Sequence, residues 1–360
     1  MNRLDGSTIT TSYVDSVVSH LMDSAHVTGA GIALFRRGEI AYLKTYGYRD
    51  VGHNLPLTTN SVMSAASLTK AAFATVVMEL VQRGTLDLDK PIAQYLPKPL
   101  PDYAKYSDLR GDDRYKTITL RMLLDHSSGF ANWRWFEKDR HLAIHFQPGS
   151  RYAYSGEGMD LAQMVVETVT GKTVSVLMRE LLFQPLGMTR TSMIWEPKFE
   201  EDLANGYDEK ETSLERSKPT QANVAGSMQT TMHDYAVFLG GVLRHRLLDA
   251  RTTSEMLRRQ LTINSAHQFP TLAPDTTTEN AAIGLGYGLG WGLYKSPAGP
   301  AFFKEGHDDG WRHLALLFEN TGDGILVMTN SSNGEAIFKP LIDSLLGPTA
   351  FPFQWEGYTT

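Results

Sequence analysis

Hydrophobic positions near the start of the chain repeat first with the period of a helix and then with that of strands. Ser12 is the expected N-cap, and apolar residues then recur every three or four positions, at Val14, Val17, Val18, Leu21 and Met22. The apolar runs 31–35 and 40–46 follow, joined by a short segment that contains Gly38. This pattern predicts an amphipathic helix and then a β-hairpin.

The period is helical again through the middle of the chain and returns to strands near its end. Helices are predicted at 68–83, 161–170, 174–183 and 232–243, the first two ending at Gly84 and Gly171. Strands are predicted at 284–294, 301–305, 313–319 and 325–331, and a last amphipathic helix at 335–346. The glycines that alternate at 284–292 indicate a strand crossed closely by other backbone.

Strands at both ends of the chain, with helices between them, predict an α/β (α+β) fold. We expect one antiparallel sheet flanked by the N- and C-terminal helices, plus an inserted, mostly helical subdomain. Residues 1–63 and 221–360 would form the sheet domain and 64–220 the helical subdomain. The cleft between the two parts is the expected active site.

Composition narrows the possible functions. Of 360 residues, 42% are hydrophobic, enough for a sizeable core. The 34 Lys and Arg against 40 Asp and Glu give a net charge of −6, with no basic cluster, so no nucleic-acid partner is expected. No apolar run is long enough to cross a bilayer, so no membrane partner is expected. The first eleven residues do not resemble a secretory signal, which favours a cytoplasmic location.

Cysteine is absent, which excludes thiolate catalysis and zinc–thiolate sites. His141 and His145 are spaced to share one helix face, but no acidic partner follows at metal-site spacing. A solvated or capping pair is the better interpretation. Neither a metal nor an organic cofactor is expected.

The strongest chemical signal is Ser67 followed three positions later by Lys70, at the start of a predicted helix. Side chains at this spacing lie on the same helix face, so the lysine can reach the serine hydroxyl. A serine is a poor nucleophile without such a base. A capped helix with an exposed lysine is the alternative, because a serine and a lysine at this spacing also occur by chance.

Two further motifs favour the catalytic interpretation. Tyr154 and Gly156 lie at the entrance of a predicted helix, where a phenol can relay a proton. Lys304 and Gly306 fall on a predicted strand, where the lysine supplies a fixed cation and the glycine would allow a substrate to approach closely.

In this order, Ser67-x-x-Lys70, Tyr154-x-Gly156 and Lys304-x-Gly306 resemble the three boxes of serine β-lactamases and penicillin-binding DD-peptidases. The chain is most similar to the branch with class C β-lactamases, family VIII carboxylesterases and D-aminopeptidases. The resemblance extends over about residues 15–345, including the stretches 84–89, 123–129, 185–188, 225–228 and 288–291.

The resemblance implies roles for individual residues. Ser67 would be the nucleophile, and Lys70 and Tyr154 would share the work of the base, with Lys304 as the nearby cation that lowers the pKa of Lys70 and favours a tyrosinate. The backbone N–H groups of Ser67 and His307 would form the oxyanion hole. Whether Lys70 or Tyr154 is the base stays open.

Two positions depart from the family pattern. Gly156 stands where the family has an asparagine whose amide holds the substrate, which disfavours β-lactam hydrolysis relative to ester cleavage. Glu305 stands where threonine or serine is common and would disfavour acidic substrates if it faces the cleft. We also expect Gly306 and Asp308 to border the substrate, although a turn-forming role for Asp308 and Asp309 is an equal alternative.

Aromatic residues of the helical insertion are candidates for an apolar lip that accepts an acyl or aryl group. They are Tyr103, Trp133, Trp135 and Phe136, and packing in the subdomain core is the more common role of such residues. His126 is expected to orient structure and not to act in catalysis.

The first hypothesis is a serine hydrolase that cleaves esters or small amides through an acyl-enzyme on Ser67, with weak β-lactam turnover at most. A D-amino-acid peptidase, a DD-carboxypeptidase or a class C-type β-lactamase is the alternative within the enzymes. A non-catalytic binder of an acyl compound or peptide is the alternative from another class. The partner is expected to be a small ester, amide or D-peptide, and the sequence does not define the oligomeric state.

Overall fold

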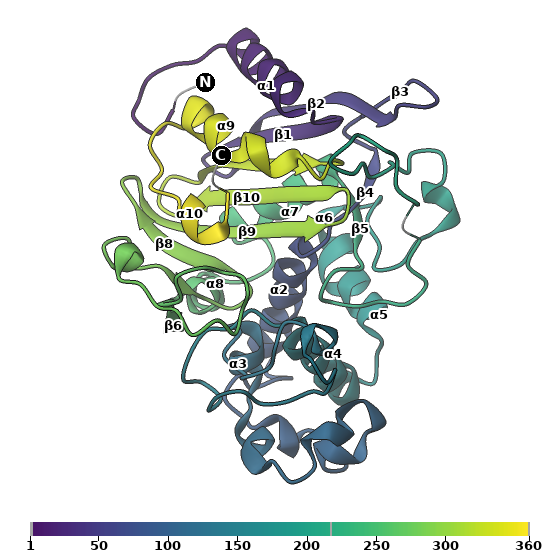
Figure 1. Cartoon of the computed structure of the whole chain (residues 1–360), viewed down its shortest axis with the longest axis vertical. Coiled ribbons are helices and arrows are strands. Elements are labelled where there is room, and N and C mark those ends of the chain that lie inside the picture. Colours follow the sequence, from purple (N-terminus) through teal and green to yellow (C-terminus); the bar gives the residue numbers. More distant parts are fainter. Residues whose placement is uncertain (1–2, 217, 359–360) are drawn as a thin grey trace.

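The computed structural model describes residues 3–216 and 218–358, and at its centre lies a sheet of nine strands (Figure 1). The strand order is β3-β2-β1-β11-β10-β9-β8-β7-β6, and neighbouring strands are antiparallel. The strands are β1 (Gly29–Arg36), β2 (Glu39–Asp50), β3 (Leu55–Pro56), β6 (Leu261–Thr262), β7 (Gly286–Tyr287), β8 (Gly292–Ser296), β9 (Gly299–Asp308), β10 (Trp311–Phe318) and β11 (Asp323–Thr329). A separate pair joins β4 (Val62–Ser64) to β5 (Gln229–Thr231).

The predicted sheet of distant segments is confirmed. β1 pairs with β11, with Ile32 opposite Val327, so the first and last thirds of the chain meet in the middle of the sheet. The helices are α1 (Thr11–Ala25), α2 (Leu68–Gln82), α3 (Leu120–Leu124), α4 (Gly156–Thr170), α5 (Val174–Met178), α6 (Gln184–Leu186), α7 (Met232–Leu243), α8 (Ala250–Leu257), α9 (Phe338–Leu345) and α10 (Phe353–Glu356). Short 3-10 turns connect several of them.

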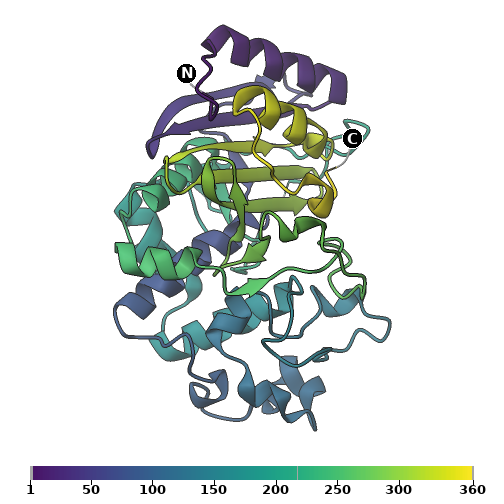
Figure 2. The ribbon, with the colours of Figure 1, turned by 90° about the vertical axis from the view of Figure 1, so that its left-hand side faces the viewer.

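The sheet is buried on both faces because successive residues of a strand point to opposite sides. In β1, Ile32 and Leu34 pack into the core beneath α1 and α9, whereas Ala33 and Phe35 pack into the core that contains α2 and α7. Figure 2 shows α9 on one side of the sheet and α7 and α8 on the other. A strand buried on both sides reads as a continuous apolar run, which is the pattern of residues 31–35.

Helix α2 links the sheet to the helical part of the molecule (Figure 1). Most of its side chains are buried, and it contacts α5, α8 and β9. The sequence placed its start near Ser67, and the helix begins at Leu68 with Ser67 at the N-cap position. Ser67 therefore lies between the sheet and the helical part. The domain division at residues 63 and 220 stays a prediction.

Two local expectations are wrong, and the bounds of a third differ. The N-cap of α1 is Thr10 and not Ser12, because the Thr10 side chain accepts a hydrogen bond from the Tyr13 backbone N–H. The expected strand 284–294 is broken between β7 and β8, where Gly290 has φ +82°. A Cβ at Gly290 would lie 2.4 Å from Ala74 Cβ, so the break brings the loop against α2. The segment 335–346 begins as a 3-10 turn before α9.

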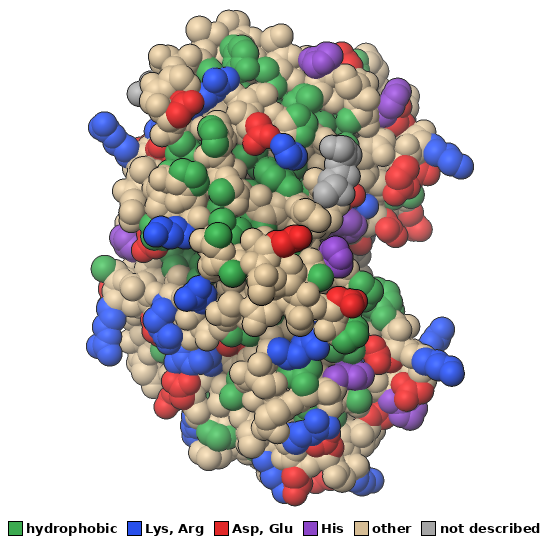
Figure 3. All heavy atoms as spheres, turned by 60° about the vertical axis from the view of Figure 1, so that its left-hand side comes forward, with side chains coloured by type: hydrophobic (Ala, Val, Ile, Leu, Met, Phe, Trp, Pro, Cys, Tyr) green, Lys and Arg blue, Asp and Glu red, His purple; other side chains and the backbone are tan. Residues whose placement is uncertain are grey.

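The surface of the described residues carries both charges. On the face in Figure 3, Lys and Arg side chains alternate with Asp and Glu. Among the described residues, no helix is long and apolar enough to cross a membrane.

Candidate active site

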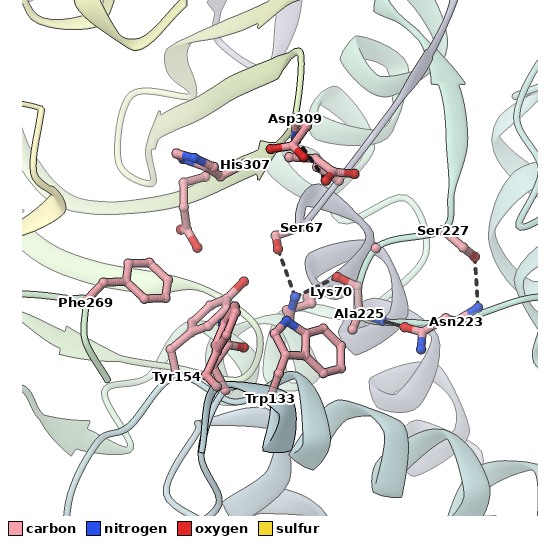
Figure 4. A pocket seen from close by; sticks show the side chains of 16 residues that line it. Ser67, Lys70, Trp133, Tyr154, Asn223, Ala225, Ser227, Phe269, His307 and Asp309 are labelled. Carbon is pink, nitrogen blue, oxygen red and sulfur yellow. Dashed lines mark hydrogen bonds between the residues drawn. The ribbon is translucent and has the colours of Figure 1, made fainter. Parts of the chain in front are cut away.

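Ser67 and Lys70 form a hydrogen-bonded pair at the start of α2. Lys70 Nζ lies 2.9 Å from Ser67 Oγ and donates a second hydrogen bond of 2.6 Å to the Ala225 backbone oxygen. Figure 4 shows the lysine between these two partners. Ala66, directly before the serine, has a left-handed φ of 45°, a strained conformation often found at functional sites. The predicted proximity of serine and lysine is therefore present.

Burial changes the protonation of Lys70. The side chain is 1% exposed, and this burial, together with the charge of Lys304, lowers its pKa from 10.5 to about 7. A buried amine loses the solvation that stabilises its charged form, and a neighbouring cation disfavours that form further. At neutral pH a large fraction of Lys70 is a neutral amine with a lone pair available to accept a proton.

Tyr154 lies between the two lysines. Lys70 Nζ and Lys304 Nζ are each 4.9 Å from the centre of its ring, and Lys304 Nζ donates a 3.2 Å hydrogen bond to its hydroxyl. Tyr154 is not the tyrosinate that the two lysines were expected to favour. Burial, and to a lesser extent the charge of Glu305, raises the pKa of Tyr154 well above 10. The desolvation of the phenolate exceeds the effect of the two cations, so Tyr154 is a neutral phenol.

His126 holds the segment that carries Tyr154. Its imidazole is fully buried, accepts a hydrogen bond from the Ser155 N–H at Nδ1 (3.2 Å) and lies 4.4 Å from the Tyr154 ring. The Ser155 hydroxyl caps α4 by accepting from the Gly158 N–H. Burial lowers the pKa of His126 well below 6.5, so the ring is neutral and is available as an acceptor. This geometry matches the orienting role expected for His126.

Strand β9 carries Lys304, Glu305 and Gly306 along one side of the site. Its pairing with β8 ends at Phe303, so beyond this residue β9 pairs with β10 alone among the described strands. A Cβ at Gly306 would lie 3.0 Å from the Ala65 backbone oxygen. The glycine thus allows β9 to approach the segment before Ser67, whereas the sequence interpretation had it admitting the substrate.

Glu305 lines the cavity and forms an ion pair with Lys304. Its Oε1 pairs with Lys304 Nζ, whereas its Oε2 is buried without a hydrogen-bond partner among the described residues. The side chain is 4% exposed. The carboxylate therefore lies at the cleft, where it can affect the charge of the substrates that bind.

These side chains line a cavity of about 660 Å³. Of the residues predicted at the site, the structure brings to it Ser67, Lys70, Trp133, Tyr154, Glu305, His307 and Asp308. Gly156 lies at the N-terminus of α4 behind Trp133. The Lys304 side chain is fully buried behind Tyr154 and Glu305.

One wall of the cavity is aromatic. Trp133, Phe136 and Phe269 line it, and Phe269 lies 5.7 Å from the Tyr154 ring. Trp135 does not line the cavity but stacks on Trp133 at 4.5 Å. Tyr103 lies elsewhere, packed against the core of the helical part. The predicted apolar lip thus has two of its four expected residues, Trp133 and Phe136, because Trp135 stacks on Trp133 and Tyr103 lies in a separate segment.

Trp133 fills the space beside Gly156. A Cβ at Gly156 would lie 2.4 to 2.7 Å from three atoms of the indole ring, closer than real Cβ contacts. The loop is fixed by Arg134, whose guanidinium forms hydrogen bonds of 2.9 and 2.8 Å with the buried carboxylate of Glu157. The missing side chain at position 156 is therefore replaced by an indole from the insertion.

Sequence reasoning missed several residues of the cavity. Asn223 accepts from the Ala225 N–H through Oδ1 (2.7 Å) and so fixes the carbonyl that binds Lys70. Asn132 accepts from the Gly156 N–H (3.0 Å), and Ser227 also lines the cavity. The family-like stretch 225–228 pointed to part of this segment. Phe269 lies in a loop without periodic pattern, so only the fold shows its position.

A buried acid from the C-terminal segment lies behind Glu305. Glu356, at the end of α10, is 7% exposed, and neither of its carboxyl oxygens has a hydrogen-bond partner among the described residues. Burial and repulsion from Glu305 raise the pKa of Glu356 well above 4.5. No motif or periodic pattern in the sequence indicates this residue.

His141 and His145 do not share a helix face, because their segment is an extended loop. Each lies near a carboxylate, His141 near Asp108 (3.7 Å) and His145 near Glu137 (3.5 Å). Within residues 3–216 and 218–358, no group of three or more possible metal ligands is assembled.

The antiparallel sheet, the helical part and the serine paired with a buried lysine define a class of serine hydrolases. The chain belongs to the beta-lactamase family, whose model matches residues 14–344. The match covers the sheet, the helical part and all the boxes singled out in the sequence.

Curated relatives are similar at low identity. Esterase EstB of Burkholderia gladioli is 30% identical over 201 residues, which are 49% of each chain. Penicillin-binding protein 4 of Amycolatopsis lactamdurans is 25% identical over 349 residues, 90% of this chain and 86% of its own. Protein flp of Staphylococcus aureus is 25% identical over 57% of this chain, and the match spans 43% of its length. The chain thus spans less than half the length of two of these relatives.

Solved structures share the fold. The octameric penicillin-binding protein homologue from Pyrococcus abyssi has a TM-score of 0.75 and 21% identity, covering 97% of this chain and 79% of that chain. D-alanine carboxypeptidase AmpC from Burkholderia cenocepacia has a TM-score of 0.74 and 17% identity, covering 93% and 98%. The predicted fold class is confirmed.

Proposed function

We propose that the protein is a serine esterase that works through an acyl-enzyme on Ser67. The observation that carries the proposal is the position of Lys70, buried and 2.9 Å from the serine hydroxyl, with a pKa lowered to about 7. A general base is most effective when its pKa lies near the working pH. This supports Lys70, and not Tyr154, as the group that accepts the serine proton.

In the proposed acylation step, neutral Lys70 accepts the Ser67 proton while Oγ attacks the carbonyl carbon of the ester. The backbone N–H groups of Ser67 and His307 stabilise the resulting oxyanion, each by a few kcal/mol. The Lys70 proton then passes to the leaving alcohol oxygen, with the neutral Tyr154 hydroxyl as relay. The alcohol departs and leaves an acyl group on Oγ.

In deacylation Lys70 is again the base, water is the nucleophile, and Ser67 is the leaving group. Lys70, neutral again, accepts a proton from a water molecule whose oxygen attacks the acyl carbonyl carbon. The second tetrahedral intermediate collapses, Ser67 Oγ leaves and takes back the proton, and the carboxylic acid is released. The Ala225 carbonyl holds Lys70 in place through both steps.

Position 156 favours esters over amides. An amide substrate gains from a side-chain amide that the family has at this box, and here Trp133 occupies that space. The 30% identity with an esterase over half of the chain supports the same choice. A peptidase or β-lactamase is the second candidate, favoured by the match to Penicillin-binding protein 4 over 90% of the chain.

Hydrolysis of p-nitrophenyl butyrate by the wild type and by Ser67→Ala tests the proposal. We expect turnover by the wild type, its loss in Ser67→Ala, and an unchanged thermal transition in the variant. Turnover that survives in Ser67→Ala would refute Ser67 as nucleophile. A wild type that is inactive on this ester but releases D-alanine from a D-alanyl-D-alanine peptide would establish the second candidate.

A further inference from the structure

The cavity next to Ser67 carries an excess of negative charge. Asp308 and Asp309 line it, and within the described residues neither carboxylate has a cation within 4.0 Å. Figure 4 shows Asp309 on the side of Ser67 opposite Tyr154 and Trp133. Burial in the cleft raises the pKa of Asp308, so Asp309 is the carboxylate on which the test below rests.

The cations near the cavity do not offset these acids. Lys304 is paired with Glu305, and Arg312 is paired with Glu335 at 3.2 Å. Arg312 also donates to the backbone oxygen of Asp308 and not to its carboxylate.

Two other groups contribute little positive charge. His307 is neutral at the pH of the test below, because an imidazole ordinarily titrates near 6.5 and desolvation together with the charge of Arg312 lowers the pKa of this ring further. Lys70 is largely neutral above pH 7, because its pKa is lowered to about 7. Arg134 and Lys105 are not among the residues that line the cavity, and their side chains pair with Glu157 and Asp160.

A second observation points to a ligand of positive charge. Glu305 is 4% exposed, faces the cavity, and has one buried oxygen, Oε2, without a hydrogen-bond partner among the described residues. The aromatic side chains of Trp133, Phe136 and Phe269 line the same cavity as these acids. Carboxylates combined with aromatic rings are the groups that bind alkylammonium ions.

We propose that this site selects esters that carry a positively charged, alkylammonium-type group, on either the acyl part or the alcohol part. The inference rests on the proposed esterase function and adds to it the charge class of the substrate. An anionic substrate of the same shape would be repelled by Asp308 and Asp309. Opposite charges a few ångströms apart in a partly solvated cleft change binding by about tenfold for each pair.

Esters that differ only in charge provide the test, at pH 8 and low ionic strength. In the acyl series, p-nitrophenyl 4-(trimethylammonio)butanoate is compared with its uncharged isostere, p-nitrophenyl 5,5-dimethylhexanoate, and with mono-p-nitrophenyl adipate. In the alcohol series, butyrylthiocholine is compared with S-(3,3-dimethylbutyl) thiobutyrate. Background hydrolysis is subtracted with Ser67→Ala.

We expect kcat/KM for the cationic ester to exceed that for its uncharged isostere by about tenfold in at least one series, and the anionic ester to be slowest. In Asp309→Asn the ratio of cationic to uncharged ester should fall by about three- to tenfold, mostly through KM. Asp23→Asn, which removes an exposed carboxylate from α1, is the matched control and should keep the wild-type ratio. Added salt should lower the preference.

The outcomes separate this inference from the proposed function. If the uncharged esters are hydrolysed through Ser67 but neither series shows a cationic preference, the charge inference is wrong and the esterase proposal stands. A preference that Asp309→Asn leaves unchanged would also overturn the inference. Failure of every ester, charged or not, would refute the esterase proposal itself.

Discussion

Substitution of Gly156 by alanine tests whether Trp133 has taken over the space of the missing side chain. The new Cβ would lie 2.4, 2.5 and 2.7 Å from three indole atoms, so the ring must move. That movement also disturbs the stack of Trp133 on Trp135, whose rings are 4.5 Å apart and inclined by 11°. The perturbation is one methyl group.

Two opposing effects determine the magnitude. Gly156 is the first residue of α4, and alanine in a helix is more favourable than glycine by up to about 1 kcal/mol. Overpacking by one methyl group costs about 1–3 kcal/mol. With Trp133 present we expect a net loss in the free energy of unfolding of about 1 kcal/mol, and with Trp133→Ala a gain of up to about 1 kcal/mol. The coupling between the two positions is therefore about 2 kcal/mol.

A double-mutant cycle measures this coupling. Urea unfolding is followed for the wild type, Gly156→Ala, Trp133→Ala and the double variant, with the slope of the free energy against urea checked for constancy. A coupling within about 0.5 kcal/mol of zero would refute the reasoning, because independent sites add to within this margin. Gly171→Ala is unsuitable as a control, since Gly171 has φ +65° and its substitution is strained for another reason.

The contact between position 156 and Trp133 also limits the effect of Gly156→Asn on acylation by a penicillin. An asparagine would restore the amide of the family's second box, but its Cβ meets the indole ring before the amide reaches the cavity. We therefore expect Gly156→Asn to leave acylation by a penicillin low, and Trp133→Ala/Gly156→Asn to raise it. Equal acylation rates in the two variants would show that the indole is not the obstacle.

Three further predictions concern charge. Because the neutral amine of Lys70 is the proposed base, kcat/KM should rise with pH through a midpoint of about 7. Lys304→Met removes a neighbouring cation and should move this midpoint to higher pH. A profile that is flat from pH 6 to 9 would contradict Lys70 as the base. Arg134→Ala should lower the free energy of unfolding by about 3 kcal/mol, because it removes the guanidinium that neutralises the buried carboxylate of Glu157 and leaves only the backbone N–H of residue 134 as a donor. The further change Glu157→Gln should restore part of this loss in urea unfolding. The pKa of Glu356 is raised in the folded state, so its contribution to stability is full below about pH 4 and decreases as pH rises. The stability of Glu356→Gln relative to the wild type should therefore increase between pH 5 and pH 8, and a constant difference in thermal unfolding would exclude a buried neutral acid.

The parts of the fold that the sequence predicted well have long, regular patterns. The helix 232–243 has the same bounds as α7. The predicted strand 301–305 lies in β9, and the predicted strand 313–319 lies in β10 except for its last residue. The expected strand 284–294 failed at Gly290, because its break is imposed by contact with Ala74 of α2, a residue over 200 positions away. The prediction of Ser12 as the N-cap of α1 was wrong because Thr10 and Ser12 are both suitable capping residues, and only the path of the chain determines which of them caps the helix.

The candidate site also has features that the local sequence predicts and features that only the fold determines. Ser67 and Lys70 are one helical turn apart, so their proximity is a local consequence of the sequence. The pKa values are not local, because they depend on how completely a group is buried and on which charges the fold brings near it. Tyr154 shows this, since two adjacent lysines suggest a tyrosinate whereas burial and Glu305 leave a neutral phenol.

By itself, the sequence determined the class of fold, the serine–lysine pair and the absence of the amide side chain at position 156, because these are properties of spacing and residue type. Only the tertiary structure decided that Trp133 fills that space, that Phe269 and Asp309 line the same cavity as Ser67, and that Glu356 is buried near Glu305. The reason is physical. Packing, desolvation and Coulomb interactions depend on distances between segments remote in sequence, and no local pattern encodes those distances.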